Sequence, residues 1–202
     1  MQVFIVYCHP SEDSFTRHVR DEFIRGLEAG GHGFEISDLY KMNFKTDMTE
    51  SEYLREANYN DGLALADDVI AEQEKINRSD TVVFIYPVFW TEAPAKLVGW
   101  FDRVWTYGFA YGDTRGENAA PRRMKTLRKA LFLCVAGHTL EHLRETGMYD
   151  AMRSVMLNDR VYDRAERKEM VVLGGTTKFF PELREANWNK HLKTAFEYGK
   201  SL

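Results

Sequence analysis

The sequence contains few cysteines and no long apolar run. Cys8 and Cys134 are its two cysteines, and both lie in apolar segments, where a free thiol behaves as a small buried hydrophobe. They are far apart and lack Cys-x-x-Cys spacing, so we expect no disulfide and no metal site. No apolar run approaches the roughly 20 residues that span a bilayer, and the chain begins directly on a strand-like segment. We therefore expect a cytoplasmic protein without direct membrane insertion.

The sequence also lacks an excess of charge of one sign. Its 27 basic and 31 acidic residues are interleaved and give a formal net charge of −4. This balance argues against nucleic acid as the main partner, although it leaves room for a local basic pocket. A chain of 202 residues can bury one substantial core, and we expect a single domain over residues 1–202.

Apolar runs alternate with amphipathic segments along the chain. Such alternation predicts an α/β fold in which parallel strands are joined by helical crossovers. Residues 40–61 interrupt the pattern with a polar, irregular stretch, which at this length is more often functional or interfacial than idle. The predicted strands are residues 3–8, 33–39, 80–86, 129–135 and 170–173, and the predicted helices run from residue 15 to the glycines at 30–31 and over 63–76, 94–105 and 185–198.

Glycine is missing where a dinucleotide-binding fold would need it. The first strand-to-helix turn, residues 8–16, contains no glycine, whereas a Rossmann pyrophosphate site uses Gly-x-Gly-x-x-Gly. Phosphate must then be held by hydroxyls, by His9 and by N–H groups of the helix N-terminus, which is the flavodoxin-like arrangement. Ordinary helix capping is the alternative role for Ser14 and Thr16. We predict a flavodoxin-like, doubly wound sheet of five parallel strands with helices on both faces.

The segment Tyr86–Ala95 is rich in aromatic residues and prolines. It joins a predicted strand to a predicted helix and therefore lies at the carboxyl edge of the sheet, where ligands bind in open α/β folds. Phe89 and Trp90 supply flat surface there, and two prolines restrict the loop. This composition suits a planar ligand. The alternative is that Phe89 and Trp90 cap the hydrophobic core.

Several segments together resemble the flavin-dependent NAD(P)H:quinone oxidoreductases and their bacterial relatives, which include ancillary flavoproteins of potassium-efflux systems. The resemblance covers residues 1 to about 112 and thins beyond residue 130. The segments that carry it are His9-Pro10-x-x-x-Ser14-Phe15, Ser37-Asp38-Leu39-Tyr40-x-Met42-Asn43-Phe44, Ala71-Glu72-Gln73, Pro87-x-x-Trp90-x-x-x-Pro94, Gly99-Trp100-Phe101-Asp102-Arg103-Val104 and Gly108-Phe109-Ala110-Tyr111.

The resemblance implies a flavin cofactor, with FAD favoured over FMN, and NAD(P)H as co-substrate. It places the flavin phosphates and ribityl chain at His9, Ser14, Phe15 and Thr16, and the isoalloxazine at Pro87, Val88, Phe89 and Trp90. It also implies a homodimer in which Phe109 and Tyr111 contribute to a substrate pocket; surface packing is the alternative for these two. The aromatic helix 94–105 could serve either a subunit interface or the core.

The sequence departs from the family after the fourth strand. Members of the family carry a small-residue loop followed by a Tyr and a His that are proposed to relay charge, whereas this chain has Gly137-His138-Thr139 and a leucine near the Tyr position. Gly137 still fits, because the backbone must approach the flavin closely there. His138 could meet the flavin or cap the following helix. The catalytic residues therefore stay open, with His138 and Tyr111 as weak candidates.

Three functions are compatible with these features. The first is an enzyme that passes two electrons from NAD(P)H to a quinone or similar small electrophile by a ping-pong mechanism. The second is a flavin-binding regulatory subunit that associates peripherally with a potassium-efflux transporter. The third, a flavodoxin-type one-electron carrier, is the weakest, because such carriers are smaller and more acidic and lack the basic segment Arg122–Arg128.

Overall fold

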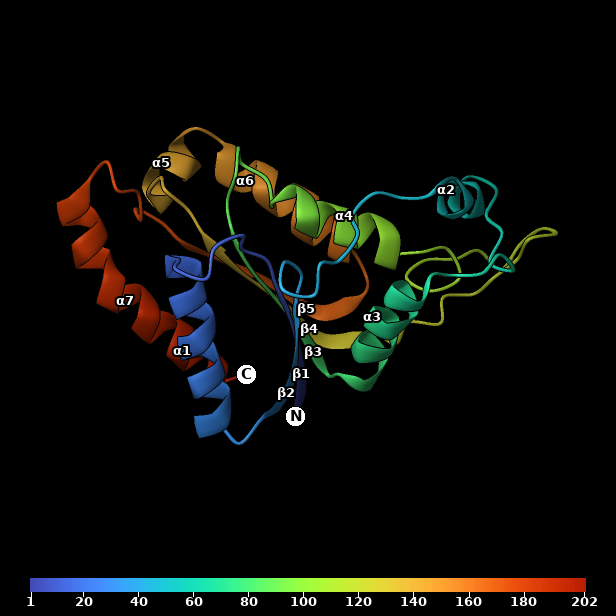
Figure 1. Cartoon of the computed structure of the whole chain (residues 1–202), viewed down its shortest axis with the longest axis horizontal. Helices are drawn as coiled ribbons and strands as arrows, with labels where there is room; N and C mark the ends of the chain where they lie inside the picture. Colours follow the sequence, from blue (N-terminus) through green and yellow to red (C-terminus); the bar gives the residue numbers. More distant parts are fainter.

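The computed structural model describes residues 1–202 as a parallel five-stranded sheet covered by helices (Figure 1). The strand order is β2-β1-β3-β4-β5, which confirms the flavodoxin-like prediction. In Figure 1, α1 and α7 lie on one face of the sheet, and α3 and α4 lie on the other. The strands are β1 (Gln2–Tyr7), β2 (Gly33–Asp38), β3 (Thr81–Pro87), β4 (Leu127–Val135) and β5 (Ala165–Leu173). The main helices are α1 (Phe15–Ala29), α2 (Glu50–Ala57), α3 (Asp67–Arg78), α4 (Ala95–Val104) and α7 (Pro181–Lys200).

Two regions differ from the sequence prediction. The stretch 40–61 was expected to be irregular, but it contains α2, which starts with a complete capping box between Thr49 and Glu52. Between β4 and β5 the chain also forms three short elements that the pattern did not predict. These are α5 (Leu140–Glu145), α6 (Met148–Arg153) and the π-helix η1 (Ser154–Val161).

The helix α4 belongs to the core of the chain itself. Trp100 is fully buried, and Phe101 and Val104 are almost completely buried beneath the sheet. The Trp100 indole N–H donates to the buried Glu72 carboxylate over 2.8 Å, so the polar end of the ring has a partner. Of the two roles considered for this helix, the core role is the one that the structure shows. No helix combines the length and apolar character needed to cross a membrane.

Close contact between α1 and α7 sets the position of the helix that begins beside the first loop. A Cβ atom at Gly26 would lie 2.1 Å from the carbonyl oxygen of Phe196, and one at Gly199 would lie 2.2 Å from that of Phe23. Both distances are far below any van der Waals contact, so each helix needs its glycine at the crossing. These backbone contacts lie near the C-terminal ends of both helices, and at the start of α1 the Phe15 ring packs against Trp188 of α7.

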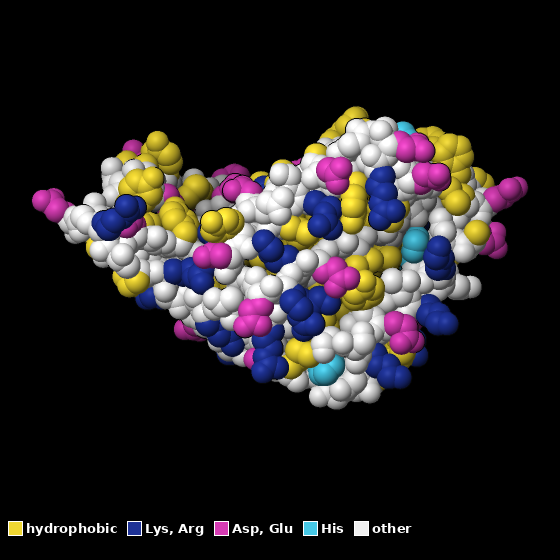
Figure 2. Space-filling model, turned by 180° about the vertical axis from the view of Figure 1, so that it is seen from behind, with side chains coloured by type: hydrophobic (Ala, Val, Ile, Leu, Met, Phe, Trp, Pro, Cys, Tyr) yellow, Lys and Arg dark blue, Asp and Glu magenta, His cyan; other side chains and the backbone are white.

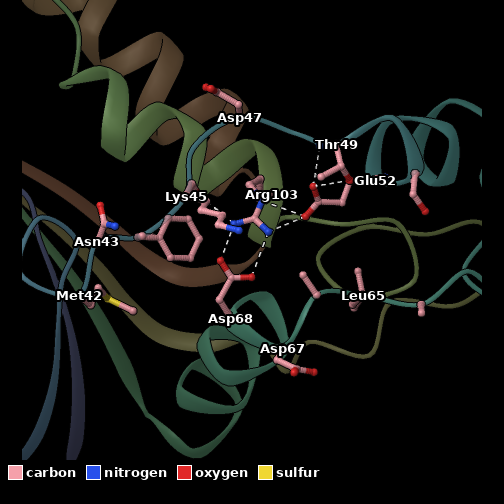
Figure 3. Close-up of a pocket in the computed structure, with 14 residues that line it drawn as sticks. Met42, Asn43, Lys45, Asp47, Thr49, Glu52, Leu65, Asp67, Asp68 and Arg103 are labelled. Carbon is pink, nitrogen blue, oxygen red and sulfur yellow. Dashed lines mark hydrogen bonds and ion pairs between the residues drawn. The ribbon is translucent and has the colours of Figure 1, made fainter.

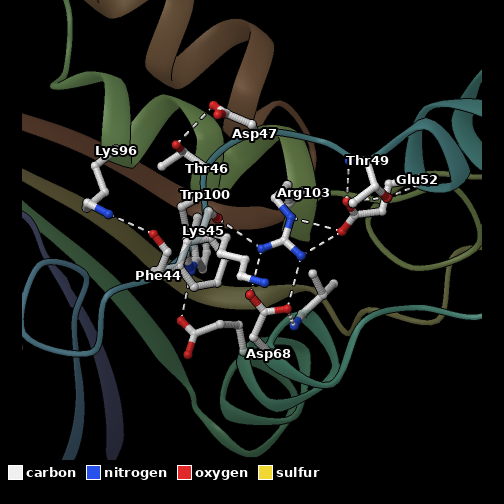
Figure 4. A network of polar contacts seen from close by, with 12 residues as sticks. Phe44, Lys45, Thr46, Asp47, Thr49, Glu52, Asp68, Lys96, Trp100 and Arg103 are labelled. Carbon is white, nitrogen blue, oxygen red and sulfur yellow. Dashed lines mark hydrogen bonds and ion pairs between the residues drawn. The ribbon is translucent and has the colours of Figure 1, made fainter.

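Arg103, on α4, forms hydrogen bonds and ion pairs with the segment between β2 and α3 and with the start of α3. All five of its N–H groups donate: to the Glu52 carboxylate, to the Asp68 carboxylate and to the carbonyl oxygen of Lys45, over 2.6 to 3.0 Å (Figure 4). The guanidinium side chain is 3% exposed. Because a buried charge is costly unless it is paired and fully hydrogen-bonded, this arrangement fixes α2, α3 and the loop before α2 relative to one another.

The same contacts shift the pKa values of both carboxylates. Burial raises the pKa of Glu52, but hydrogen bonds from Arg103 and Thr49 outweigh it, and the pKa is lowered on balance. Hydrogen bonds from Arg103 lower the pKa of Asp68 against the opposing effect of burial. A carboxylate whose pKa is lower in the folded state stabilises the fold above its unfolded pKa of about 4. That stabilisation is lost as the pH falls through the folded pKa.

We predict that Arg103→Leu lowers the free energy of unfolding at neutral pH by about 3 to 5 kcal/mol, because it leaves two carboxylates without their cation. Urea denaturation between about pH 3 and pH 7 measures this. The wild type should lose stability steeply below about pH 5, and the variant less steeply. Arg78→Leu, which removes an exposed pair with Glu35, is the control and should cost no more than about 1 kcal/mol. A neutral-pH cost for Arg103→Leu as small as that of the control would contradict the prediction.

Candidate functional site

Four parallel strands end together and bring three loops to one edge of the sheet. Tyr7 pairs with Ile85, Pro87 pairs with Val135, and Val135 pairs with Leu173. The loop after β1, the loop after β3 and the loop after β4 therefore leave the sheet side by side. This is the edge at which open α/β sheets bind ligands.

The N-terminus of α1 presents unpaired backbone donors at this edge. Ser14 is the N-cap, and its hydroxyl accepts the Arg17 N–H over 3.1 Å, so the capping role considered for this residue is confirmed. The N–H groups of Phe15 and Thr16 lie in the first turn, where an α-helix offers no intrahelical partner. Together with the helix dipole, they form a site for an anion.

His9 lies beside that N-terminus and is half-buried. Its Nδ1 atom is 3.0 Å from both the N–H and the carbonyl oxygen of Ser11, so the loop itself uses this nitrogen. The Nε2 atom is left for a ligand. Burial lowers the pKa of His9, and a hydrogen bond to Ser11 opposes this shift only in part. The lowered pKa favours the neutral ring while no anion is bound.

The aromatic loop after β3 is held in an unusual turn. Val88 donates its N–H to the Val135 carbonyl oxygen over 2.8 Å, and Phe89 and Glu92 exchange both of their backbone hydrogen bonds over 2.9 Å. The two central residues, Trp90 and Thr91, have φ angles of 51° and 67°. Positive φ at two successive residues is typical of a type I′ turn, which normally uses Asn and Gly. Each such residue stores about 1 to 3 kcal/mol of strain, a feature that clusters at functional sites.

A cavity of about 390 Å³ connects these groups. Its wall contains Gly137, where an added Cβ would touch the protein only at the Thr177 Cβ, 3.6 Å away. Packing of the chain therefore does not require glycine here, whereas close approach of a ligand would. The lining includes eight of the predicted cofactor residues, namely His9, Ser14, Phe15, Thr16, Pro87, Val88, Phe89 and Gly137. Trp90 does not line it, because its side chain is 99% exposed.

The lining of this cavity also contains Trp188, Arg184 and Lys178, which the sequence did not single out. The rings of Phe15 and Trp188 are 4.3 Å apart, and the Arg184 guanidinium lies 4.6 Å above Trp188. Lys178 adds a second cation to the lining. The spacing of Arg184 and Trp188 places both on one face of α7, but in the sequence they look like ordinary surface residues. Only the packing of α7 against α1 brings them to the site.

His138 does not cap the helix that follows it. The N-cap of α5 is Thr139, whose hydroxyl accepts the His142 N–H over 3.2 Å. The His138 ring instead stacks on the His142 ring at a centroid distance of 4.5 Å. The chain just after β5 approaches this loop closely, since a Cβ atom added at Gly174 would lie 2.7 Å from the His138 carbonyl oxygen.

The two predicted substrate residues lie in different surroundings. Phe109 is 3% exposed and packs in the core of the chain, so its contact with a substrate stays a prediction. Tyr111 donates its hydroxyl to Glu56 over 2.7 Å and lines a cavity of about 440 Å³ with Trp105 and Arg164. Neither residue lies at the cavity beside His9 and Gly137.

A larger cavity lies at a different place in the molecule. Its volume is about 600 Å³, and it lies between the loop before α2 and the start of α3 (Figure 3). Its most deeply buried charge is Arg103, whose N–H groups all have protein partners. Four carboxylates line this cavity, and its arginine is fully used by protein partners, so it is poorly suited to an anionic group. We therefore place the functional site at the carboxyl edge of the sheet.

Known proteins resemble this chain in sequence and in structure. A family model described as "Flavodoxin-like fold" matches residues 1–161. Human ribosyldihydronicotinamide dehydrogenase [quinone] is 32% identical over 160 residues, covering 73% of this chain and 68% of that protein. A ribosyldihydronicotinamide dehydrogenase-like protein of Penicillium crustosum is 30% identical over 173 residues, covering 77% of this chain and 65% of that protein. The chain thus spans about two thirds of the length of these two relatives.

A solved structure matches the chain over nearly its whole length. The NAD(P)H:quinone oxidoreductase from Methanothermobacter marburgensis is 43% identical, with a TM-score of 0.86 and coverage of 98% of this chain and 96% of that one. A putative quinone reductase from Klebsiella pneumoniae is 26% identical, with a TM-score of 0.78 and coverage of 96% and 83%. The chain therefore belongs to the flavodoxin-like family of flavin-dependent NAD(P)H:quinone oxidoreductases and is an enzyme of the oxidoreductase class.

Proposed function

We propose that the chain binds FAD at the carboxyl edge of the sheet, accepts a hydride from NADH or NADPH, and passes two electrons to a quinone or similar small electrophile. The observation that carries the proposal is the cavity in which His9 Nε2, the first N–H groups of α1 and the open position at Gly137 converge. A bound flavin supplies the hydride exchange, and the protein supplies binding, orientation and electrostatics.

Different residues of the cavity suit different parts of a flavin. The free N–H groups of Phe15 and Thr16 and the Nε2 atom of His9 suit a phosphate. The chain at Pro87 and Val88 provides a wall fixed by the Val88 hydrogen bond to β4, which suits the planar ring. Gly137 leaves space in the lining for close approach of the ring. The strained turn at Trp90 and Thr91 holds the aromatic loop in place beside the cavity.

Three further lining residues favour FAD over FMN. A phosphate group and an isoalloxazine would use the groups from His9 to Gly137, and the same cavity is also lined by Trp188, Arg184 and Lys178. An aromatic ring and two cations are suited to a second planar group and a second phosphate. The adenosine diphosphate half of FAD has both.

A homodimer is the second part of the proposal. Apolar side chains on and beside α2 are exposed, including Tyr53 at 60%, Tyr59 at 57% and Leu54 at 42%. In Figure 2, hydrophobic side chains gather at the end of the molecule opposite α7. Patches of this kind mark protein interaction sites in soluble proteins. In a dimer formed through α2, Tyr111 of each subunit would lie near the subunit interface.

The alternative function, a regulatory subunit of a potassium-efflux transporter, would use the same flavin residues. It predicts binding of flavin and nucleotide without rapid turnover of a soluble acceptor. No feature of the site favours it over the enzyme, and the kinetic experiment below separates the two.

Replacing His9 by alanine should weaken FAD binding by about 1 to 3 kcal/mol, because the hydrogen bond from Nε2 to a charged phosphate is lost. Titration of flavin-free protein with FAD, followed by fluorescence quenching, measures the dissociation constant. His32→Ala, at the opposite end of α1, is the matched control and should leave it unchanged. Equal affinities for wild type and His9→Ala would show that His9 only shapes its loop.

Trp188→Ala should weaken FAD by about 1 to 3 kcal/mol, the usual value of stacking between a base and an aromatic side chain. FMN lacks the adenosine half, so its affinity is the internal control and should change little. The same titration with the two flavins gives both constants. A wild-type protein that prefers FMN, or a variant that loses both flavins equally, would refute the assignment of Trp188 to the adenine.

In sedimentation velocity experiments the wild type should be a dimer, and Leu54→Asp should shift it toward the monomer. A charge placed at the centre of an apolar contact is left desolvated and unpaired. Ile70→Asp, at an exposed position of α3, is the control and should stay dimeric. A monomeric wild type would contradict the dimer without affecting the assignment of the flavin site.

Initial rates at several fixed quinone concentrations should give parallel double-reciprocal plots with NADH or NADPH as the varied substrate. This pattern is expected because reductant and oxidant would stack in turn on the same exposed face of the flavin. The oxidised nucleotide then leaves before the quinone binds to the reduced enzyme. Intersecting lines would show that both substrates bind together. Slow turnover of every soluble quinone by a protein that still binds flavin would favour the regulatory alternative.

A further inference from the structure

The turn after β3 is bonded to a distant part of the chain through one side chain. Within Phe89–Glu92 the two backbone hydrogen bonds join the ends of the turn to each other, and Glu92 alone reaches another element. Its Oε1 atom accepts a hydrogen bond from Nη1 of Arg160 over 3.1 Å. The same oxygen accepts the Ala93 N–H over 2.8 Å. The carboxylate thus connects the turn to the segment between β4 and β5.

Arg160 is held in place by contacts with α4. The π-helix η1, the orange segment that follows α6, runs beside α4 (Figure 1). The Arg160 guanidinium lies 5.2 Å from the centre of the Phe101 ring, and the Arg160 carbonyl oxygen accepts the Trp105 indole N–H over 2.6 Å. The Arg160 side chain is 16% exposed and that of Glu92 is 39% exposed, so solvent screens their attraction only in part. Because α4 holds Arg160, this arginine can fix the position of Glu92.

Both partners belong to segments with uncommon backbone geometry. Trp90 and Thr91 have positive φ without being glycine, and such conformations persist only where the surroundings enforce them. Arg160 belongs to a π-helix of eight residues that ends at Tyr162 with a φ of 46°. π-helices are rare and occur mostly as short bulges near functional sites. An ion pair that joins two such segments indicates a constraint on where the turn lies.

The turn borders the proposed flavin site. Val88 and Phe89 line the cavity of about 390 Å³, whereas Glu92 and Arg160 do not. The Val88 N–H bond to β4 fixes one side of this wall. The ion pair with Arg160 fixes the other side, at the end of the turn. The pair can therefore act on a ligand of this cavity only through the wall that it holds.

We propose that Glu92 and Arg160 are positioning residues of the flavin site. Their ion pair holds the turn Phe89–Glu92 so that Val88 and Phe89 present a rigid wall to the isoalloxazine. The inference rests on the proposed function and adds two residues that act through the turn without touching the flavin. A wall that is ordered before the ligand arrives spares the conformational entropy of ordering it on binding. Without the pair, the strained turn relaxes and that advantage is lost.

Hydrogen exchange of the flavin-free protein tests the first step. Mass spectrometry of peptides that cover residues 88–93 follows the amides of the turn. In Arg160→Met, which keeps an unbranched side chain over the aromatic ring but removes the cation, we expect exchange faster by about fivefold to tenfold. In Glu92→Gln the effect should be smaller, about twofold to threefold, because the amide oxygen still accepts a hydrogen bond without charge assistance. Arg153→Met, the same change on neighbouring α6, is the matched control.

Titration with FAD tests the second step. We expect the dissociation constant to rise about fivefold to tenfold in Arg160→Met, about twofold to threefold in Glu92→Gln, and not at all in Arg153→Met. The double variant Glu92→Gln, Arg160→Met should bind no more weakly than Arg160→Met, because both changes break the same contact. Arg160→Lys, which restores the cation, should recover most of the affinity. Thermal unfolding of the flavin-free variants separates these effects from a general loss of stability.

Each outcome supports or overturns the inference. Unchanged exchange and affinity in both single variants would make the pair an ordinary surface ion pair, and faster exchange with unchanged affinity would confine its role to the turn itself; either result overturns the inference alone. Additive losses in the double variant, or an equal loss in Arg153→Met, would also overturn it. If Arg160→Met does not fold, Glu92→Gln decides the question. A wild type that takes up no flavin would refute the proposed function, and the positioning role with it.

Discussion

The site depends on the alignment of four parallel strands that end at one level. The ladder from β1 through β3 and β4 to β5 keeps Tyr7, Pro87 and Val135 near the same edge. Because the register of a parallel sheet fixes where each strand ends, it also fixes where the three loops leave the sheet. The donors of α1, the aromatic turn and the glycine at residue 137 then face one cavity.

Packing on the two faces of the sheet refines this arrangement. On one face, Gly26 and Gly199 allow the backbones of α1 and α7 to touch, and near the starts of the same two helices Trp188 packs against Phe15 in the lining of the cavity. On the other face, Arg103 joins the long excursion after β2 to α4, the helix that the aromatic turn enters. The fold thus positions the site from both sides.

The sequence predicted the sheet well because its strands are buried on both faces and read as apolar runs. The absence of glycine in residues 8–16 was sufficient to select the flavodoxin-like order, which the structure confirms. The prediction for β5 covered only its C-terminal part, residues 170–173, and missed residues 165–169, because the first half of the strand carries exposed charges. The helix α2 was missed because its signal is a capping box in a polar context, without a long apolar period.

Other parts of the site could not be predicted, because they depend on contacts between distant segments. Trp188 and Arg184 become site residues only through the crossing of α1 and α7. The turn at Trp90 and Thr91 places two residues without a glycine at positive φ, against local preference.

The most direct test of the account is a crystal structure of the protein with FAD. The account predicts one phosphate within hydrogen-bond distance of His9 Nε2 and the Phe15 and Thr16 N–H groups, the isoalloxazine between Val88 and Gly137, and the adenine at Trp188. Flavin bound in the cavity beside Arg103, or no flavin in crystals of protein saturated with FAD, would contradict it.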